Sequence, residues 1–248
     1  IIFLKASTQI GGALWFFQVL LIVLIVYAAF EYILCVILKD EKKHFLIQGC
    51  AAILLLIIGY YCSLTGKKLH GFNRVCSVYI LVYLGSLIKQ KNVMEKLGAH
   101  NWLFPLAGVS FISLCVGYHR GYIALDGNHI DNPLFFLLMS SSGWFLLYAI
   151  AVLMEKHRTW INEALIYISR HSVVIVALHF LAFKIVNIII VECLNMPKYM
   201  IAAFPVLTTD GTWWMFYFIV GVVVPLGIEK TWWCMKQLLC SRLKRRRV

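Results

Sequence analysis

Residues 172–191 read SVVIVALHFLAFKIVNIIIV, an apolar run of 20 residues with only a few polar interruptions. A transmembrane helix needs about 20 consecutive apolar residues to cross the hydrocarbon core of a bilayer. The run therefore predicts a membrane-spanning helix.

Six further stretches are long enough, or nearly long enough, to cross a bilayer: 11–38, 45–63, 72–88, 101–117, 133–153 and 213–228. Of the 248 residues, 62% are hydrophobic, and the mean hydropathy is +0.83, far above that of an ordinary soluble domain. Only helices and closed barrels satisfy the backbone in lipid, and the period-2 alternation of a membrane barrel is absent. We expect an all-α, polytopic membrane bundle of seven helices, forming a single transmembrane domain over residues 1–248.

The basic residues are distributed unevenly between the two sides of this bundle. The net charge is +12, and sixteen Lys and Arg lie in loops 39–44, 89–100 and 154–170 and in the tail from residue 229. Only six lie in the loops of the opposite side. The positive-inside rule places the richer side, including the C-terminus, in the cytoplasm. Because this charge sits in short loops, the expected partner is the lipid bilayer, and no nucleic acid is expected.

Sequence motifs exclude several enzyme classes. The chain has no G-x-S-x-G nucleophile elbow, no H-E-x-x-H metal motif and no phosphate-binding loop. Its eight cysteines are scattered singly, without a C-x-x-C pair or a His/Cys spacing that would suggest zinc. A hydrolase, an ATPase or a metalloprotease therefore has no support, and neither a metal site nor a tightly bound cofactor is expected.

His179 is the most unusual residue of the segment 172–191. It lies eight residues past the inner boundary, which is about 12 Å at a helical rise of 1.5 Å per residue, near the midplane of the hydrocarbon core. Ser172 lies seven residues earlier and shares its helix face. An ionisable residue at this depth is by default a functional candidate. A hydrogen-bonded packing role is the equally open alternative.

Other polar residues of the spans also have two interpretations. Lys184 and Asn187 share a different face, and Lys184 either faces the protein or extends toward the membrane surface. Arg74 and Arg120 lie at the outer ends of their spans, where each pairs with lipid phosphates or contacts an anionic substrate. The small residues 140–143 favour close helix packing, or else form a polar wall of a substrate channel.

The stretch 167–180, YISRHSVVIVALHF, resembles a late helix of the acyltransferase-3 family, whose polytopic members O-acylate bacterial surface sugars. The residues that match the family pattern are Tyr167, Ile168, Ser172, Leu178 and His179. Ser169 stands where the family usually has Gly, and His171 stands where Asn is common.

Three more stretches resemble the same family in the same order. GALWFFQVLLIV at 12–23 is similar to a Leu-Trp-Phe helix, and VYLGSLIKQK at 82–91 matches a helix exit through Gly85 and Lys89, with Ser86 in place of an aromatic residue. NHIDNPLFFLL at 128–138 is similar to the Asn-Pro helix start of the fucose 4-O-acetylase-like branch. From the residues alone, Asp131 or Asn132 is expected to cap the helix that Pro133 begins.

The resemblance implies a function and a membrane. Family members transfer an acetyl or similar acyl group from an acyl-CoA, with acetyl-CoA the expected donor, to a sugar hydroxyl of a cell-surface polysaccharide or its lipid-linked precursor. They reside in the bacterial inner membrane. Ser172 and His179 would line the substrate cavity, and Arg74, Arg120 and Asn132 would lie near its outer mouth.

The resemblance also implies an N-terminal truncation. Family members typically have about ten spans, and the catalytic His lies in the first, about ten residues after an Arg. The seven segments here would be the last seven, so no catalytic residue is assigned to this chain. A transporter or flippase for a lipid-linked sugar, another membrane acyltransferase class and a non-catalytic membrane subunit are the alternatives. A transporter predicts broken helices in matched halves, and only Pro225, between Gly221 and Gly227, suggests one.

Overall fold

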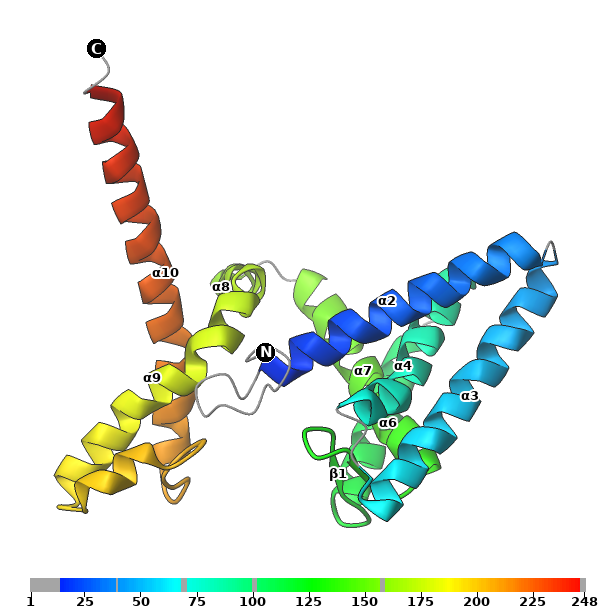
Figure 1. The fold of residues 1–248 in the computed structure, drawn as a ribbon, viewed down its shortest axis with the longest axis horizontal. Coiled ribbons are helices and arrows are strands. Elements are labelled where there is room, and N and C mark those ends of the chain that lie inside the picture. Colours follow the sequence, from blue (N-terminus) through cyan, green and yellow to red (C-terminus); the bar gives the residue numbers. More distant parts are fainter. Residues whose placement is uncertain (1–13, 39, 68–70, 100–101, 157–158, 246–248) are drawn as a thin grey trace. The chain divides into compact units, whose positions relative to one another are not determined.

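A computed structural model describes residues 14–38, 40–67, 71–99, 102–156 and 159–245. The described chain is almost entirely helical (Figure 1), which confirms the prediction of an all-α polytopic membrane fold. Six of its helices are long and apolar enough to cross a bilayer. They are α2 (Leu14–Ile37), α3 (Glu41–Thr65), α4 (Phe72–Gln90), α7 (Pro133–Lys156), α9 (Ser172–Cys193) and α10 (Trp213–Arg245).

The predicted span 101–117 is also helical, as α6 (Leu103–Tyr118), but with 16 residues it is shorter than the other six. At 1.5 Å per residue it is about 24 Å long, short of the hydrocarbon core of about 30 Å. Whether it crosses the membrane therefore stays a prediction. The remaining elements are α5 (Val93–Ala99), α8 (Trp160–Arg170), the 3-10 helix η1 (Lys198–Ala202) and the strands β1 (Ile123–Ala124) and β2 (His129–Ile130).

Local sequence explains where α3 begins and ends. Asp40 precedes the helix, and its Oδ1 accepts a hydrogen bond from the backbone N of Lys42 at 3.0 Å, which satisfies one of the free N–H groups of the first turn. Gly66 follows the helix with φ of 64°, a left-handed conformation that glycine adopts without a Cβ penalty. An N-terminal Asp cap and a C-terminal Gly also mark the ends of many helices in soluble proteins.

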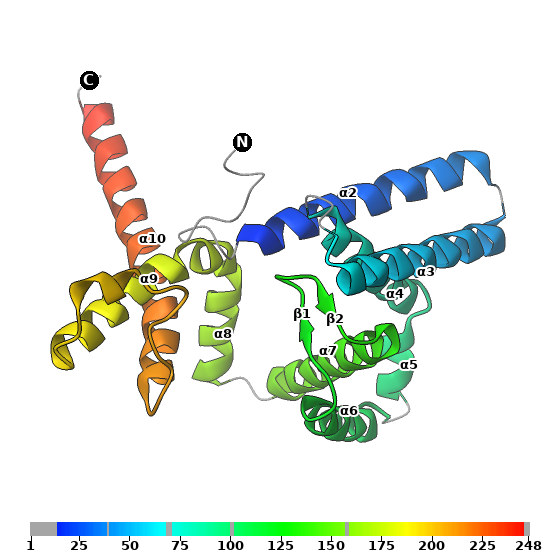
Figure 2. The same ribbon diagram turned by 60° about the horizontal axis from the view of Figure 1, so that its bottom comes forward.

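The described chain forms two compact units, one within residues 16–158 and the other within residues 159–248. In the first, the α2–α7 unit, α3 packs along α4, α6 packs along α7, and the β1–β2 hairpin lies against α3 (Figure 2). Gly59 allows the close approach of α3 to α4, because a Cβ there would lie 2.3 Å from Ser77 Oγ. Division into two units leaves the single-domain expectation a prediction.

In the second, the α8–α10 unit, α9 packs against α10 and η1 lies on α9. Its core consists of Val186, Ile190 and Tyr217, with Phe183, Val206 and Leu207 packed around them. Within the basic loop 154–170, residues 160–170 form the helix α8.

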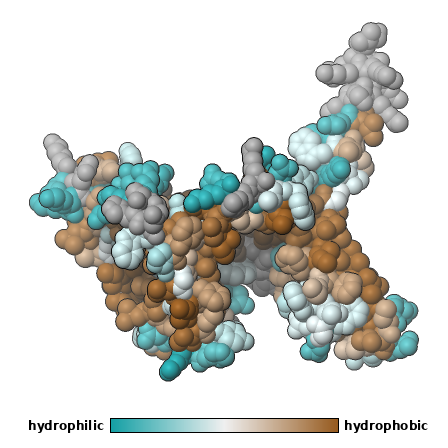
Figure 3. All heavy atoms as spheres, turned by 180° about the vertical axis from the view of Figure 1, so that it is seen from behind, coloured by the Kyte–Doolittle hydropathy of each residue, from teal (hydrophilic) through white to brown (hydrophobic). Residues whose placement is uncertain are grey.

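Large apolar side chains cover the outside of both units. Leu54 on α3 is 59% exposed and Phe218 on α10 is 69% exposed. On the face drawn in Figure 3, hydrophobic residues cover the flanks of the helices, and hydrophilic residues gather near the helix ends. A water-soluble protein rarely exposes patches of this extent. The arrangement indicates a multi-pass membrane protein in a lipid bilayer.

Candidate functional site

Two of the predicted site residues lie near the β1–β2 hairpin and make structural hydrogen bonds. The Arg74 guanidinium, at the start of α4, donates to the backbone carbonyl of Asp126 in the hairpin turn. Asn132 Oδ1 accepts from the backbone N of Leu134 at 2.8 Å and of Phe135 at 3.3 Å. Asn132 is therefore the residue that caps α7, one of the two caps expected from the sequence.

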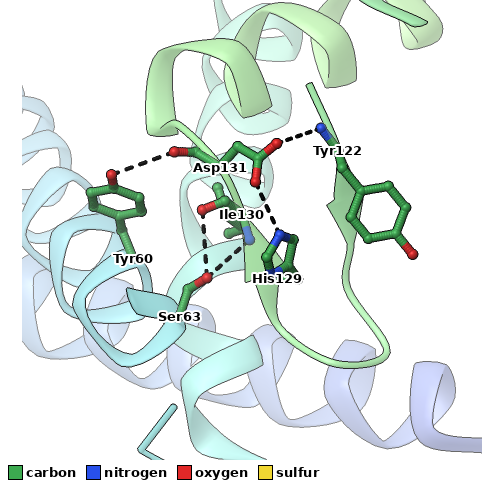
Figure 4. Close-up of polar contacts among 6 residues, drawn as sticks. All are labelled: Tyr60, Ser63, Tyr122, His129, Ile130 and Asp131. Carbon is green, nitrogen blue, oxygen red and sulfur yellow. Dashed lines mark hydrogen bonds and ion pairs between the residues drawn. The ribbon is translucent and has the colours of Figure 1, made fainter. Parts of the chain in front are cut away.

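The hairpin also places a histidine beside a carboxylate (Figure 4). His129 Nε2 lies 2.9 Å from Asp131 Oδ1, and Asp131 Oδ2 accepts from the backbone N of Tyr122 at 2.6 Å. Both side chains of the pair are exposed, His129 by 53% and Asp131 by 42%. A carboxylate that fixes one ring nitrogen leaves the other available to hold a proton or a ligand hydroxyl.

Long-range hydrogen bonds hold this hairpin on α3. Ser63 Oγ accepts from the backbone N of Ile130 at 3.0 Å and donates to its carbonyl at 3.4 Å, and Tyr60 donates to the carbonyl of Asp131 (Figure 4). Asn128, 2% exposed and with φ of 55°, bonds to both α3 and α4. These partners are 51 to 71 residues apart in sequence, so no local pattern predicts them.

Arg120 lies just after α6 and is exposed. Its backbone N donates to the carbonyl of Gly117 at 2.9 Å. No contact among the described residues joins its side chain to Arg74 or Asn132. Arg74 bonds to the hairpin turn and Asn132 caps α7, so the outer mouth formed by these residues and Arg120 stays a prediction.

His179 and Ser172 belong to the α8–α10 unit. His179 lies in α9 with Nδ1 2.9 Å from the carbonyl of Val176 and 3.1 Å from that of Ile175, and its ring packs on Phe180. An Nδ1–H that donates to its own helix leaves Nε2 as an acceptor. Ser172 is the first residue of α9 and is exposed. The five predicted substrate-binding residues are thus divided between two units and do not form one described site.

Lys184 and Asn187 share a face of α9, as their spacing predicts, and they bind the end of η1 and the residue that follows it. Lys184 Nζ donates to the carbonyl of Ala203 at 2.6 Å, and Asn187 Nδ2 donates to the carbonyls of Ile201 and Ala203 at 3.1 and 3.2 Å. Tyr217 of α10 donates to Asn187 Oδ1 at 2.5 Å. Asn187 is completely buried, so this network has a structural role in anchoring the segment at the end of η1.

A groove of about 250 Å³ lies between α4 and α7. Its walls come from one face of each helix: Leu81, Leu84, Gly85 and Ile88 of α4, and Ser140, Ser141, Trp144 and Phe145 of α7. A Cβ on Gly85 would meet no atom within 4 Å, so this glycine keeps the groove open. Ser140 and Ser141 of the small-residue stretch 140–143 therefore line this groove, and a substrate channel at this place stays a prediction.

A cluster of polar side chains lies on the opposite face of α4. The sequence analysis did not predict this cluster, although its members lie within the predicted spans. The rings of Tyr27 on α2 and Tyr79 on α4 have centroids 5.7 Å apart, and the side chains of Glu31, Gln48 and Ser86 lie near the Tyr27 side chain. Gln48 and Tyr79 are 2% and 1% exposed. Neither the Gln48 amide nor the Tyr79 hydroxyl has a hydrogen-bond partner within the described parts of the chain.

Comparison with known proteins gives no match to a family model, to a curated protein or to a solved structure. Among the residues that the structure describes, no group of three or more His, Cys, Asp or Glu side chains is arranged to hold a metal ion.

Proposed function

We propose that this protein is a membrane O-acyltransferase. It would transfer an acetyl or similar acyl group from an acyl-CoA, acetyl-CoA being the expected donor, to a hydroxyl of a sugar. The sugar would belong to a cell-surface polysaccharide or to its lipid-linked precursor. The proposed location is the bacterial inner membrane, with the C-terminus in the cytoplasm, where the excess of basic residues favours it.

The observation that carries the proposal is the groove between α4 and α7, because a residue of the family-like stretches helps to form it. Gly85 belongs to the stretch that resembles the family's helix exit, and it keeps the groove open beside Ser140 and Ser141. Acyl transfer inside a membrane needs such an interhelical cavity, where a donor and an acceptor meet away from bulk water.

Other residues of the family-like stretches lie at or near helix starts, which supports the proposal. Asn132 caps α7, and Ser172 begins α9 with His179 two turns further on. A transporter would need broken helices in matched halves. In the described chain Pro225 lies inside α10, and no other helix has an internal proline beyond its first turns.

The chemistry would follow general base catalysis. A base removes the proton of the sugar hydroxyl, whose oxygen attacks the thioester carbonyl, and the tetrahedral intermediate expels the CoA thiolate, which takes up a proton. No residue of this chain is assigned as the base. Ser172 and His179 remain proposed cavity residues, and Arg74, Arg120 and Asn132 remain proposed residues of its outer mouth.

Acylation of surface glycan tests the proposal directly. The complete reading frame is deleted and then restored on a plasmid, and the O-acyl content of purified polysaccharide and of lipid-linked precursors is measured by mass spectrometry. We expect acyl groups that disappear on deletion and return on complementation. Unchanged acylation together with accumulation of an unflipped lipid-linked sugar would identify the protein as a transporter instead.

A further inference from the structure

The dimensions of the α4–α7 groove limit what it can hold. Its volume of about 250 Å³ is below the range of about 300–1,000 Å³ that is usual for sites that enclose a drug-sized ligand. A whole acyl-CoA is larger than such a ligand. The groove therefore accommodates one part of a donor, and the rest of the molecule lies outside it.

The lining determines which part enters. None of the lining residues carries a charge, and most of the wall is aliphatic or aromatic. The phosphates of CoA would lose their hydration there without gaining a partner, which is strongly unfavourable. A neutral, mostly apolar group complements this wall and gains dispersion contacts with it.

Two hydroxyls in the wall identify a polar feature of the occupant. Ser140 and Ser141 line the groove, and neither hydroxyl makes a hydrogen bond with another described residue. A hydroxyl without a partner is costly at membrane depth, so an acceptor on the ligand is favoured. A carbonyl oxygen accepts a hydrogen bond from a serine and adds no charge.

The position of the serines along α7 favours an acyl-CoA donor over a membrane lipid as the occupant of the groove. Ser140 lies seven residues into α7, which is about 10 Å at 1.5 Å per residue. Ester carbonyls of bilayer lipids lie at the headgroup boundary, outside the hydrocarbon core. A lipid tail would bring only methylene groups to the serines, whereas an acyl thioester would bring its carbonyl.

We propose that the α4–α7 groove binds the acyl group of the acyl-CoA donor, with the thioester carbonyl at Ser140 and Ser141 and the alkyl chain along the apolar wall. The identity of the donor rests on the proposed function. Gly85 sets the space for the chain, because a side chain at this position would extend into the groove without displacing other atoms near its Cβ.

A filled groove provides the test. The protein, expressed from its complete reading frame, is placed in lipid nanodiscs with hexanoyl-CoA that carries a diazirine on its alkyl chain, and labelled peptides are identified by mass spectrometry after irradiation. We expect label in α4 or α7, competed by unlabelled hexanoyl-CoA. Gly85→Leu should reduce this label at least fivefold, and the double variant Ser140→Ala, Ser141→Ala should reduce it at least twofold.

Gly108→Leu is the matched control. Gly108 lies inside α6, its Cβ would meet no atom within 4 Å, and it does not line the groove. Its label should equal that of the wild type. Equal label in Gly85→Leu and wild type would overturn the proposal. So would labelling of the groove-lining residues themselves by a photoreactive phosphatidylcholine that hexanoyl-CoA does not displace, because the occupant would then be a lipid tail.

The outcomes for the groove and for the reaction are independent. Acyl-CoA-specific label in a protein whose deletion leaves all glycan acylation unchanged would refute the proposed function and retain the groove as an acyl-CoA site. Glycan acylation by a protein whose groove is unlabelled, or is labelled equally in Gly85→Leu, would retain the function and refute the groove.

Discussion

The α9 network of the α8–α10 unit and the cluster of Tyr27, Gln48 and Tyr79 in the α2–α7 unit are two different arrangements of polar side chains inside apolar helices, although Glu229 Oε2 of α10 is also buried without a described hydrogen-bond partner. In the α8–α10 unit, Lys184 and Asn187 of α9 and Tyr217 of α10 all take part in hydrogen bonds that anchor the segment at the end of η1. In the α2–α7 unit, the Gln48 amide and the Tyr79 hydroxyl are buried without a hydrogen-bond partner among the described residues. The first arrangement is a structural network, and the second consists of polar groups with unused bonding capacity.

This difference distinguishes two kinds of polar residue within spans, which the sequence alone does not tell apart. Every polar residue within a span is a functional candidate, because its exposure to lipid is costly. Lys184 and Asn187 of α9 offset that cost because they donate hydrogen bonds to backbone carbonyls of the segment at the end of η1. Ser140 and Ser141 make no hydrogen bond with another described residue, whereas Asn187 binds the fold, so the proposed ligand-binding role applies to the two serines and not to Asn187.

The largest expected effect comes from breaking the bonded network. Asn187→Leu removes three hydrogen bonds of a completely buried side chain and leaves the Tyr217 hydroxyl and two carbonyls without that partner. Each such loss costs about 1–3 kcal/mol, so we expect a decrease of about 3 kcal/mol in the free energy of unfolding. The melting temperature of the purified protein in detergent, monitored by size-exclusion chromatography after heating, measures this loss.

Ile188→Leu is the control, because Ile188 is the next residue of α9 and is exposed. Its melting temperature should equal that of the wild type. An Asn187→Leu protein that melts at the wild-type temperature would show that the network contributes no stability, and the contrast between the two units would fail.

The sequence predicted the helices of both units but only part of this contrast. Long apolar runs predict membrane helices because bilayer thickness fixes their length, and the spacing of Lys184 and Asn187 correctly predicts a shared face. Their common target, the carbonyl of Ala203, depends on how η1 returns to α9, which no local pattern encodes.

The site in the α2–α7 unit was predicted least well, for the same physical reason. Asn128 bonds to Gly59 and Ser77, and the groove exists because α4 and α7 present particular faces to each other. Such pairings come from tertiary packing. A sequence signal was nevertheless present for the serine wall, since residues 140–143 are small and polar within an apolar span.

An intermediate effect is expected at His179, whose place in the contrast is undecided. Its Nδ1 bonds to its own helix, as in a structural residue, whereas its Nε2 has no described hydrogen bond. If Nε2 contacts substrate, His179→Phe should lower glycan acylation per unit of membrane protein about tenfold, equivalent to about 1.4 kcal/mol. His179→Asn, which keeps a hydrogen-bonding group, should lose less.

Leu181→Phe is the control for the added aromatic volume, because Leu181 lies on the same helix and is 47% exposed. It should retain normal acylation. Lys184 is unsuitable for this purpose, since it holds the carbonyl of Ala203. Normal acylation by His179→Phe at normal abundance would assign His179 to packing and remove it from the proposed cavity.

The smallest effect, and the sharpest test of the contrast, is expected from deleting a buried hydroxyl. Tyr79→Phe removes only an oxygen that has no described partner, and Tyr32→Phe makes the same change at a side chain that is 71% exposed. A buried hydroxyl without a hydrogen bond has lost its contacts with water and gained no replacement, which destabilises the folded protein. Tyr79→Phe should therefore raise the free energy of unfolding by about 1 kcal/mol, whereas Tyr32→Phe should leave it unchanged. Chemical unfolding of the two variants beside the wild type measures the difference. A loss of stability in Tyr79→Phe would mean that the hydroxyl is bonded, for example to buried water, and the polar groups of the α2–α7 unit would then be structural like those of α9.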